Sequence, residues 1–281
     1  MPLTGRMHFL ARDPKYLHEK PYTLRYAPGP EDGFPQSNID RVQHDILLHD
    51  LRPELELLEY GRCGFMLANC PSAMRYDDYD DSSKVEGVHA AEVTDVVRRA
   101  LGAASADLLD WVVRRRHPTW PIATGTSYAF NQPASRAHID HTYEGSRTII
   151  RGTYGEKAEA ILEGRWQCVN VWHPLRGPLV DWPLAVCDAS TVDFANDSMP
   201  GDVVDRDHVF ENTQIHHNEN QKWYYLSKQI PSEMIIFKNA DSEEPNGAAP
   251  GVPHASFDNP NTKDTDIRRE SIEMRILVQW R

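Results

Sequence analysis

Short, largely apolar and β-prone runs recur along the chain from Tyr128 to the end, and Gly, Pro, Asn and Asp separate them. The runs cover residues 148–150, 167–172, 184–187, 223–226, 234–237 and 271–280. Several short strands with turn signals between them are typical of a β-sandwich or barrel. The pattern therefore predicts a mainly β, jelly-roll or cupin-like core, a double-stranded β-helix, over about residues 121–281.

The first 120 residues show a different pattern. Residues 1–60 are rich in Pro, Tyr and charged residues, which predicts extended segments and turns wrapped over the body of the protein. An apolar run of strand length follows at 64–67. We expect one catalytic domain over 1–281, with an extended and helical cap over about 1–120.

Two helices are predicted within this cap. Apolar residues recur at helical spacing over 93–101, and Gly102 supplies a stop. A second helix is predicted over 106–116, with apolar residues at 108, 109, 112 and 113 buried. Its last three residues are arginines, which suit the carboxyl end of a helix dipole.

Composition narrows the possible classes of protein. A net charge of -12 over 281 residues argues against nucleic acid as a partner, since binding to phosphates requires a clustered basic surface. The four cysteines are too few and too scattered for a disulfide framework, and are expected to be free and buried. No signal peptide or membrane-spanning run is evident, so we expect a cytoplasmic protein without a membrane partner. A homodimer is left open.

Candidate metal ligands lie in the stretch 136–142. On an extended chain His138 and Asp140 point to the same side and can grip one ion together. His254 opens a short strand-like segment ahead of the final strand, and a rolled sheet can bring such distant segments together. Two imidazoles and one carboxylate form the facial triad of non-heme Fe(II) oxygenases, which leaves coordination positions open.

Other ligand sets are weighed against this triad. His216 and His217 compete with His254 for the third position, but their surroundings are polar and turn-like. His141 falls on the opposite face and is expected to support the site rather than bind the ion. Zinc is chemically possible, although a carboxylate in a facial set with open positions suits Fe(II) better.

The final strand carries candidate groups for a cosubstrate. Arg269, Ser271, Glu273 and Arg275 share one face by alternation. A guanidinium can hold a carboxylate through paired hydrogen bonds, so Arg269 is expected to bind the distal carboxylate of 2-oxoglutarate, with Ser271 adding a hydrogen bond. Arg268 or Arg275 takes that role if the strand is offset. An exposed edge with Arg–Glu pairs is the structural alternative. Asn170 is a further candidate polar contact.

The sequence resembles a family of Fe(II)/2-oxoglutarate-dependent enzymes of secondary metabolism, the fungal hydroxylase/desaturase group related to bacterial cephalosporin 7α-methoxylase components. The resemblance runs over nearly the whole chain and includes the segments 20–22, 50–52, 64–65, 137–140, 170–178, 183–188, 223–225, 237–238, 253–254 and 269–275. Two positions depart from the family pattern, Lys222 and His173. Neither is a proposed ligand, so the departures bear on the substrate more than on the reaction class.

The resemblance implies His138, Asp140 and His254 as iron ligands and Arg269 as the cosubstrate anchor. It implies an oxygenase that consumes 2-oxoglutarate and O₂, releases succinate and CO₂, and oxidises a small metabolite by hydroxylation, desaturation or a related C–H oxidation. Two rival hypotheses remain. A metal-dependent hydrolase or isomerase on a cupin-like barrel would not need O₂, and a catalytically silent binding module would retain no metal.

Overall fold

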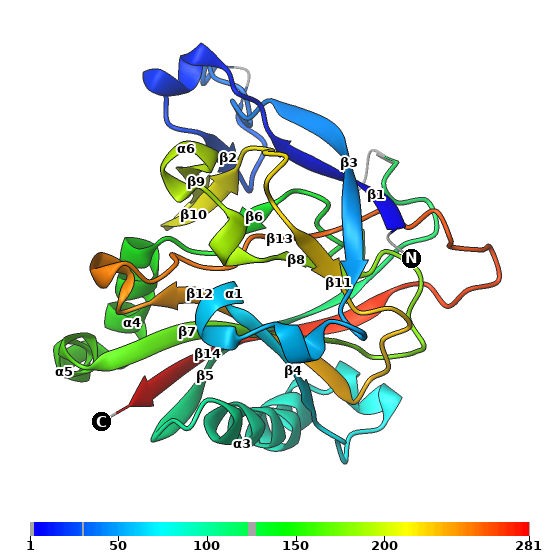
Figure 1. The fold of residues 1–281 in the computed structure, drawn as a ribbon. Coiled ribbons are helices and arrows are strands. Elements are labelled where there is room, and N and C mark those ends of the chain that lie inside the picture. Colours follow the sequence, from blue (N-terminus) through cyan, green and yellow to red (C-terminus); the bar gives the residue numbers. More distant parts are fainter. Residues whose placement is uncertain (1–2, 30, 123–127, 281) are drawn as a thin grey trace.

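Two β-sheets form the body of the protein, which a computed structural model describes over residues 3–29, 31–122 and 128–280 (Figure 1). The nine-stranded sheet has the order β1 (Leu3–Leu10), β3 (Arg41–Asp50), β11 (Trp223–Tyr225), β8 (Leu184–Cys187), β13 (His254–Ser256), β6 (His138–Ile139), β10 (Val209–Ile215), β9 (Ser198–Val204) and β2 (Tyr22–Leu24). The five-stranded sheet has the order β4 (Phe65–Asn69), β12 (Glu233–Asp241), β7 (Arg165–Pro174), β14 (Glu270–Trp280) and β5 (Ser105–Arg115). The predicted mainly β, jelly-roll core is confirmed.

The inner faces of the two sheets pack against each other. One buried cluster joins Trp172, Ile235 and Phe237 of the five-stranded sheet to Leu184 and Val186 of the nine-stranded sheet. Burying such large apolar side chains contributes about 1.5–3 kcal/mol each, so this layer holds the sheets together. The space between the sheets is where the candidate site residues meet.

The first 120 residues contribute strands to both sheets. β1 and β3 pair antiparallel, with Leu3 opposite Leu48 and Leu10 opposite Arg41, and β3 then pairs with β11. β4 and β5 form the two edges of the five-stranded sheet. Within the extended arm expected over residues 1–60, β1, β2 and β3 belong to the nine-stranded sheet, where pairing satisfies their backbone groups.

The helix predicted over 106–116 is wrong, since this segment is strand β5. It pairs antiparallel with β14 from Glu270 opposite Arg115 to Gln279 opposite Ser105. The apolar positions fit a helix as well as a strand, and only the partner strand decides between them. Trp111, Val112 and Val113 are also residue types that pack well on a pleated surface.

The strand predicted at 148–150 is also wrong, because these residues lie within helix α4 (Tyr143–Tyr154). The Thr142 side chain caps this helix by accepting a hydrogen bond from the backbone N–H of Gly145. Ile150 then packs with Ala158 and Leu162 of α5 (Ala158–Glu163) and with Trp166 of β7. A cap upstream of the β-branched run thus outweighed its strand propensity.

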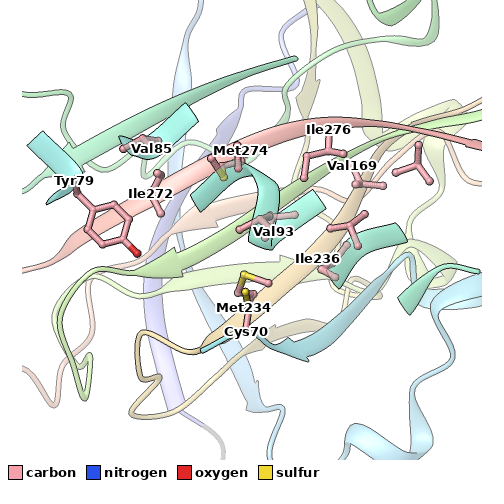
Figure 2. Close-up of a cluster of buried hydrophobic side chains, with 14 of the residues drawn as sticks. Cys70, Tyr79, Val85, Val93, Val169, Met234, Ile236, Ile272, Met274 and Ile276 are labelled. Atoms are coloured by element: carbon pink, nitrogen blue, oxygen red, sulfur yellow. The ribbon is translucent and has the colours of Figure 1, made fainter. Parts of the chain in front are cut away.

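The helix predicted over 93–101 is confirmed as α3 (Ala90–Ala100), which covers the outer face of the five-stranded sheet. Figure 2 shows Val93 of this helix among Val169, Ile236 and Ile276 of the sheet. Gly102, with φ of +61°, ends the helix in the left-handed region that glycine adopts freely. The remaining helices are short: α1 (Tyr60–Cys63), α2 (Ser82–Lys84) and α6 (Phe194–Asp197).

Two histidines face each other beneath the helical layer. His173 Nδ1 donates to the carbonyl of Pro174 at 3.0 Å, so its Nε2 can accept the 2.9 Å hydrogen bond from Nε2 of His89. Both rings lie close to Tyr79, which Figure 2 shows in the same core. Burial lowers the pKa of His89, and burial together with His89 lowers the pKa of His173 to about 3. Both rings are therefore neutral in the folded protein at pH 7.

This pair predicts a loss of stability in acid. The unfolded chain takes up protons near pH 6.5 while the buried rings do not, so stability falls as the pH drops below 6.5. For His173 the fall continues toward pH 3, by up to about 1.4 kcal/mol per pH unit. Replacing His173→Gln keeps a hydrogen-bond acceptor for His89 and removes one of the two buried imidazoles. Urea unfolding at pH 7 and pH 5 should show a smaller loss for this variant than for the wild type. His18→Gln, at an exposed histidine, is the control for the substitution itself. Equal losses in His173→Gln and wild type would contradict the prediction.

All four cysteines are free and buried, as predicted. Within the described residues, no helix combines the length and the apolar character needed to cross a membrane.

Candidate metal centre and cosubstrate cavity

Three side chains from distant parts of the chain converge on one point. His138 lies on β6, Asp140 follows that strand, and His254 opens β13 directly opposite His138. His138 Nε2 lies 3.2 Å from Asp140 Oδ1, and His254 Nε2 lies 3.8 Å from the same oxygen. One ligand atom from each residue falls within 4.8 Å of the other two, and no other cluster of this kind is found in the described part of the chain.

The hydrogen bonds of both rings direct their lone pairs toward this point. Nδ1 of His138 donates to the carbonyl of Arg136 at 2.6 Å, and Nδ1 of His254 donates to the carbonyl of Val252 at 3.1 Å. The Nε2 atom of each ring then faces the carboxylate oxygen. Burial, and next the neighbouring His138, lower the pKa of His254 to about 3, so that ring is neutral at pH 7 and its Nε2 is an acceptor. A metal ion between the three atoms would bind all of them.

The second carboxylate oxygen of Asp140 is occupied by the protein. Asn170 of β7 donates to Oδ2 at 2.7 Å, and Nε of Arg275 on β14 donates to it at 2.9 Å. Burial alone would raise the pKa of Asp140, but the neighbouring Arg275 holds it well below the ordinary value. The carboxylate is thus ionised and turned so that only Oδ1 faces the histidines.

A small cavity joins the two histidines to Arg269. Its lining includes His138, His254, Arg269, Ser256, Glu273 and Arg114. The guanidinium of Arg269 donates to the carbonyl of Trp182 at 2.9 Å, to the hydroxyl of Ser271 at 3.2 Å and to Ser256, and it lies over the ring of Trp172. None of the described carboxylates forms an ion pair with it. Burial, with the charge of Arg114, lowers the pKa of Arg269 to about 9.

The competing residues lie elsewhere. His216 is buried, and its Nδ1 donates a hydrogen bond to the carbonyl of Leu10. His217 stacks on His44 with 4.0 Å between the ring centroids. His141 Nδ1 accepts from Asn239 and is not part of the cluster. Arg268 is exposed, whereas Arg269 is buried. The alternation predicted along β14 therefore places Arg269 inside the protein and leaves Arg268 outside it.

Comparisons with known proteins agree with this geometry. The chain matches the family model described as "Oxidoreductase/YMDC permease-like domain" over residues 7–279. It is 33% identical over 263 residues to the Fe(II)/2-oxoglutarate-dependent dioxygenase nvfI of Aspergillus novofumigatus, covering 91% of this chain and 90% of that protein. The chain belongs to the Fe(II)/2-oxoglutarate-dependent dioxygenases.

Further relatives of this dioxygenase are fungal. It is 27% identical to the alpha-ketoglutarate-dependent dioxygenase tstK of Talaromyces stipitatus, over 90% of this chain and 94% of that protein. It is also 27% identical to the hydroxylase/desaturase efuI of Hormonema carpetanum, over 84% of this chain and 83% of that protein. The solved structure of the iron and alpha-ketoglutarate-dependent endoperoxidase NvfI superposes with a TM-score of 0.84 at 30% identity, over 99% and 97% of the chains. The predicted relation to cephalosporin 7α-methoxylase components stays a prediction.

Several residues of the dioxygenase's cavity have positions that sequence reasoning did not foresee. Arg114 lines the cavity because β5 is a strand whose Arg114 pairs with Ser271, and the predicted helix hid this position. Asn170 and Arg275 both donate to Asp140, a contact that the sequence did not indicate, and their contact with a cosubstrate stays a prediction. Glu273 was placed on the correct face by alternation, yet it lines the cavity rather than an exposed edge, and burial raises its pKa.

The contact between Arg275 and Asp140 leads to a testable prediction. Replacing Arg275→Gln removes a charge-assisted donor from Oδ2, so the carboxylate can rotate. We expect the affinity for Fe(II) to fall about 10- to 100-fold, the usual effect of losing a partner that orients a metal ligand. Equilibrium dialysis of Fe(II) under anaerobic conditions measures this. Arg99→Gln, on the exposed side of α3, is the control; an unchanged affinity in Arg275→Gln would show that Asn170 alone holds the carboxylate.

Proposed function

We propose that His138, Asp140 and His254 hold Fe(II) as a facial triad. The observation that carries this proposal is the convergence of two Nε2 atoms and one carboxylate oxygen within 4.8 Å of one another. Two imidazoles and a carboxylate on one side of an ion, with the other positions open, suit a ferrous centre of a non-heme oxygenase. Arg275 and Asn170 would keep Asp140 monodentate and leave those positions free.

We further propose that Arg269 holds the distal carboxylate of 2-oxoglutarate, with Ser271 beside it. The proposal is supported by a buried guanidinium that lacks a carboxylate partner among the described residues and opens onto the same cavity as both histidines. A buried cation without a counter-ion is costly, and a bound carboxylate relieves that cost through paired hydrogen bonds. Trp172, under the guanidinium, limits its orientation to the cavity side.

The bound ion, 2-oxoglutarate and O₂ supply the oxidising power, with release of succinate and CO₂, while the protein orients the reactants and excludes water. No side chain is required as a nucleophile. The substrate we propose is a small secondary metabolite oxidised at a C–H bond. Its relatives are named for outcomes as different as hydroxylation or desaturation and endoperoxide formation. The outcome therefore depends on which part of the substrate the cavity presents to the ion.

Three further parts of the proposal concern the whole protein. Residues 1–281 form a single catalytic domain, because strands from both halves of the chain build the two sheets that enclose the cavity. The protein is cytoplasmic. A homodimer is the assembly to test, and sedimentation equilibrium of the full chain measures it directly.

Anaerobic reconstitution tests the proposed function. Purified protein is mixed with Fe(II) and 2-oxoglutarate, and the visible charge-transfer absorption of a ferrous 2-oxo acid chelate is recorded. Admission of O₂ should then yield succinate, measured by mass spectrometry. A protein that binds Fe(II) but shows no such absorption with 2-oxoglutarate would contradict the cosubstrate proposal, and one that binds no Fe(II) would contradict the triad.

A further inference from the structure

Two arginines line the cavity, and two more lie close to the strand that carries His138. Arg114 and Arg269 line the cavity with His138. Arg136 lies two residues before His138, and its carbonyl holds the Nδ1 proton of that ligand. Alternation along the extended chain places the Arg136 side chain on the same side as His138 and Asp140. Its side chain is exposed, which puts it at the mouth rather than in the depth of the site.

Arg41, the first residue of β3, is linked to the strand next to His138. Its Nη2 donates at 2.9 Å to Oε1 of Gln214, which lies directly opposite His138 on the neighbouring strand β10. Cross-strand partners share a face of the sheet, so Gln214 and His138 both face the cavity side. Nη1 of Arg41 is buried and has no hydrogen-bond partner within the described residues. A buried guanidinium N–H without a partner points to a missing acceptor.

These guanidiniums are close enough to act on one another. Burial and the charge of Arg136 lower the pKa of Arg41 to about 9. In the described part of the chain, none of the four forms an ion pair with a carboxylate. Other arginines of the protein do form ion pairs with carboxylates, because its 42 acidic residues outnumber its 30 basic residues. Adjacent unpaired cations in an acidic protein are destabilising, and such arrangements are candidates for function.

One molecule of 2-oxoglutarate does not neutralise the positive charge of all four arginines. 2-Oxoglutarate would place its distal carboxylate on Arg269 and its other end on the ion. Glu273 lies on β14 next to β5, near enough to Arg114 for their charges to interact, and offsets one further cation. Arg41, which bonds Gln214 opposite His138, and Arg136, two residues before that ligand, still have no counter-ion among the described residues. A guanidinium fork matches a carboxylate best, because two parallel N–H donors meet its two oxygens.

We propose that the substrate oxidised at this site is a small organic acid whose carboxylate is held by Arg41 and Arg136. The inference rests on the proposed function and adds the substrate class. The acid group would bind at the mouth, and the rest of the molecule would extend toward the ion. Local positive charge also offsets the repulsion that a protein of net charge -12 exerts on an approaching anion.

Benzoate and benzamide, which have nearly the same shape, test the inference. Each is titrated by calorimetry into the anaerobic protein loaded with Fe(II) and saturating 2-oxoglutarate. The visible absorption of the chelate must persist, so that displacement of 2-oxoglutarate is recognised. We expect benzoate to bind at least about 10-fold more tightly than benzamide, because a charge-assisted contact adds about 1.5–3 kcal/mol, and tenfold corresponds to about 1.4 kcal/mol.

The variants identify the residues. Arg41→Gln and Arg136→Gln should each lower benzoate affinity about 10-fold and leave benzamide unchanged, while Arg41→Lys and Arg136→Lys retain part of the preference. Arg206→Gln is the matched control, since Arg206 stacks on Tyr26 away from the cavity. Should Arg41→Gln fail to fold, the exposed Arg136 still provides the test. Equal binding of the two probes by the wild type overturns the inference, as does a preference that survives both Gln variants. If the chelate never forms, the proposed function fails instead.

Discussion

Replacement of His254→Ala is expected to abolish succinate formation and the visible absorption of the ferrous 2-oxoglutarate complex. The ring supplies one of three donors, and it lies in the centre of the nine-stranded sheet between β8 and β6. Its Nε2 cannot be replaced by a neighbour, because no further histidine, cysteine or acidic residue joins the cluster in the described part of the chain. Anaerobic titration with Fe(II), followed by an oxygen-consumption assay, measures both losses.

His217→Ala is the matched control for this variant. His217 was the rival third ligand, and it stacks on His44 outside the cluster. Its removal should leave Fe(II) binding and succinate formation close to those of the wild type. Circular dichroism of both variants reports whether the fold is retained. Full activity of folded His254→Ala would remove this residue from the metal site.

Replacement of Arg269→Gln is expected to raise the dissociation constant for 2-oxoglutarate about 10- to 150-fold while the affinity for Fe(II) stays unchanged. A hydrogen bond to a charged group contributes about 1.5–3 kcal/mol, which corresponds to this range. Glutamine keeps polar hydrogen-bonding capacity for Ser256 and Ser271 but removes the charge. Titration of 2-oxoglutarate into the Fe(II)-loaded protein, followed by its visible absorption, measures the change.

Arg268→Gln is the control beside it, because Arg268 is the exposed neighbour on the same segment. It should bind 2-oxoglutarate as the wild type does. An equal loss of Fe(II) affinity in Arg269→Gln would instead indicate that β14 has lost its packing. The packing of β14 depends on this residue in a second way, because the backbone N–H of Arg269 donates to Asp181 and holds the start of the strand.

Local patterns were sufficient for much of the sheet and for the residues that meet at the centre. The apolar runs at 167–172, 184–187 and 234–237 form strands β7, β8 and β12. Alternation alone placed His138 and Asp140 on one side of the chain, and put Arg269 and Glu273 on one face of β14. These predictions succeeded because the period of two follows from backbone geometry, whatever the partner strand is.

Predictions from local sequence patterns failed where another segment of the chain decided the structure. Residues 106–116 fit a helix until β14 is placed beside them, and residues 148–150 fit a strand until Thr142 begins helix α4. The side chain of Arg275 donates to Asp140, 135 positions earlier in the sequence. The pairing of β5 with β14 and the contact of Arg275 with Asp140 leave no local sign in the chain, since both depend on which strands become neighbours.

The sequence by itself determined the chemistry available: two histidines and an aspartate able to bind iron, a guanidinium able to bind a 2-oxo acid, and a β-rich chain to carry them. Tertiary structure alone decided how they combine. Pairing of β13 with β6 brought His254 to His138, and the facing sheets brought Arg275 to Asp140. Packing also brought Arg41 to Gln214, directly opposite His138. Such contacts are set by sheet register, which is fixed by the burial of one face of every strand at once rather than by any single segment.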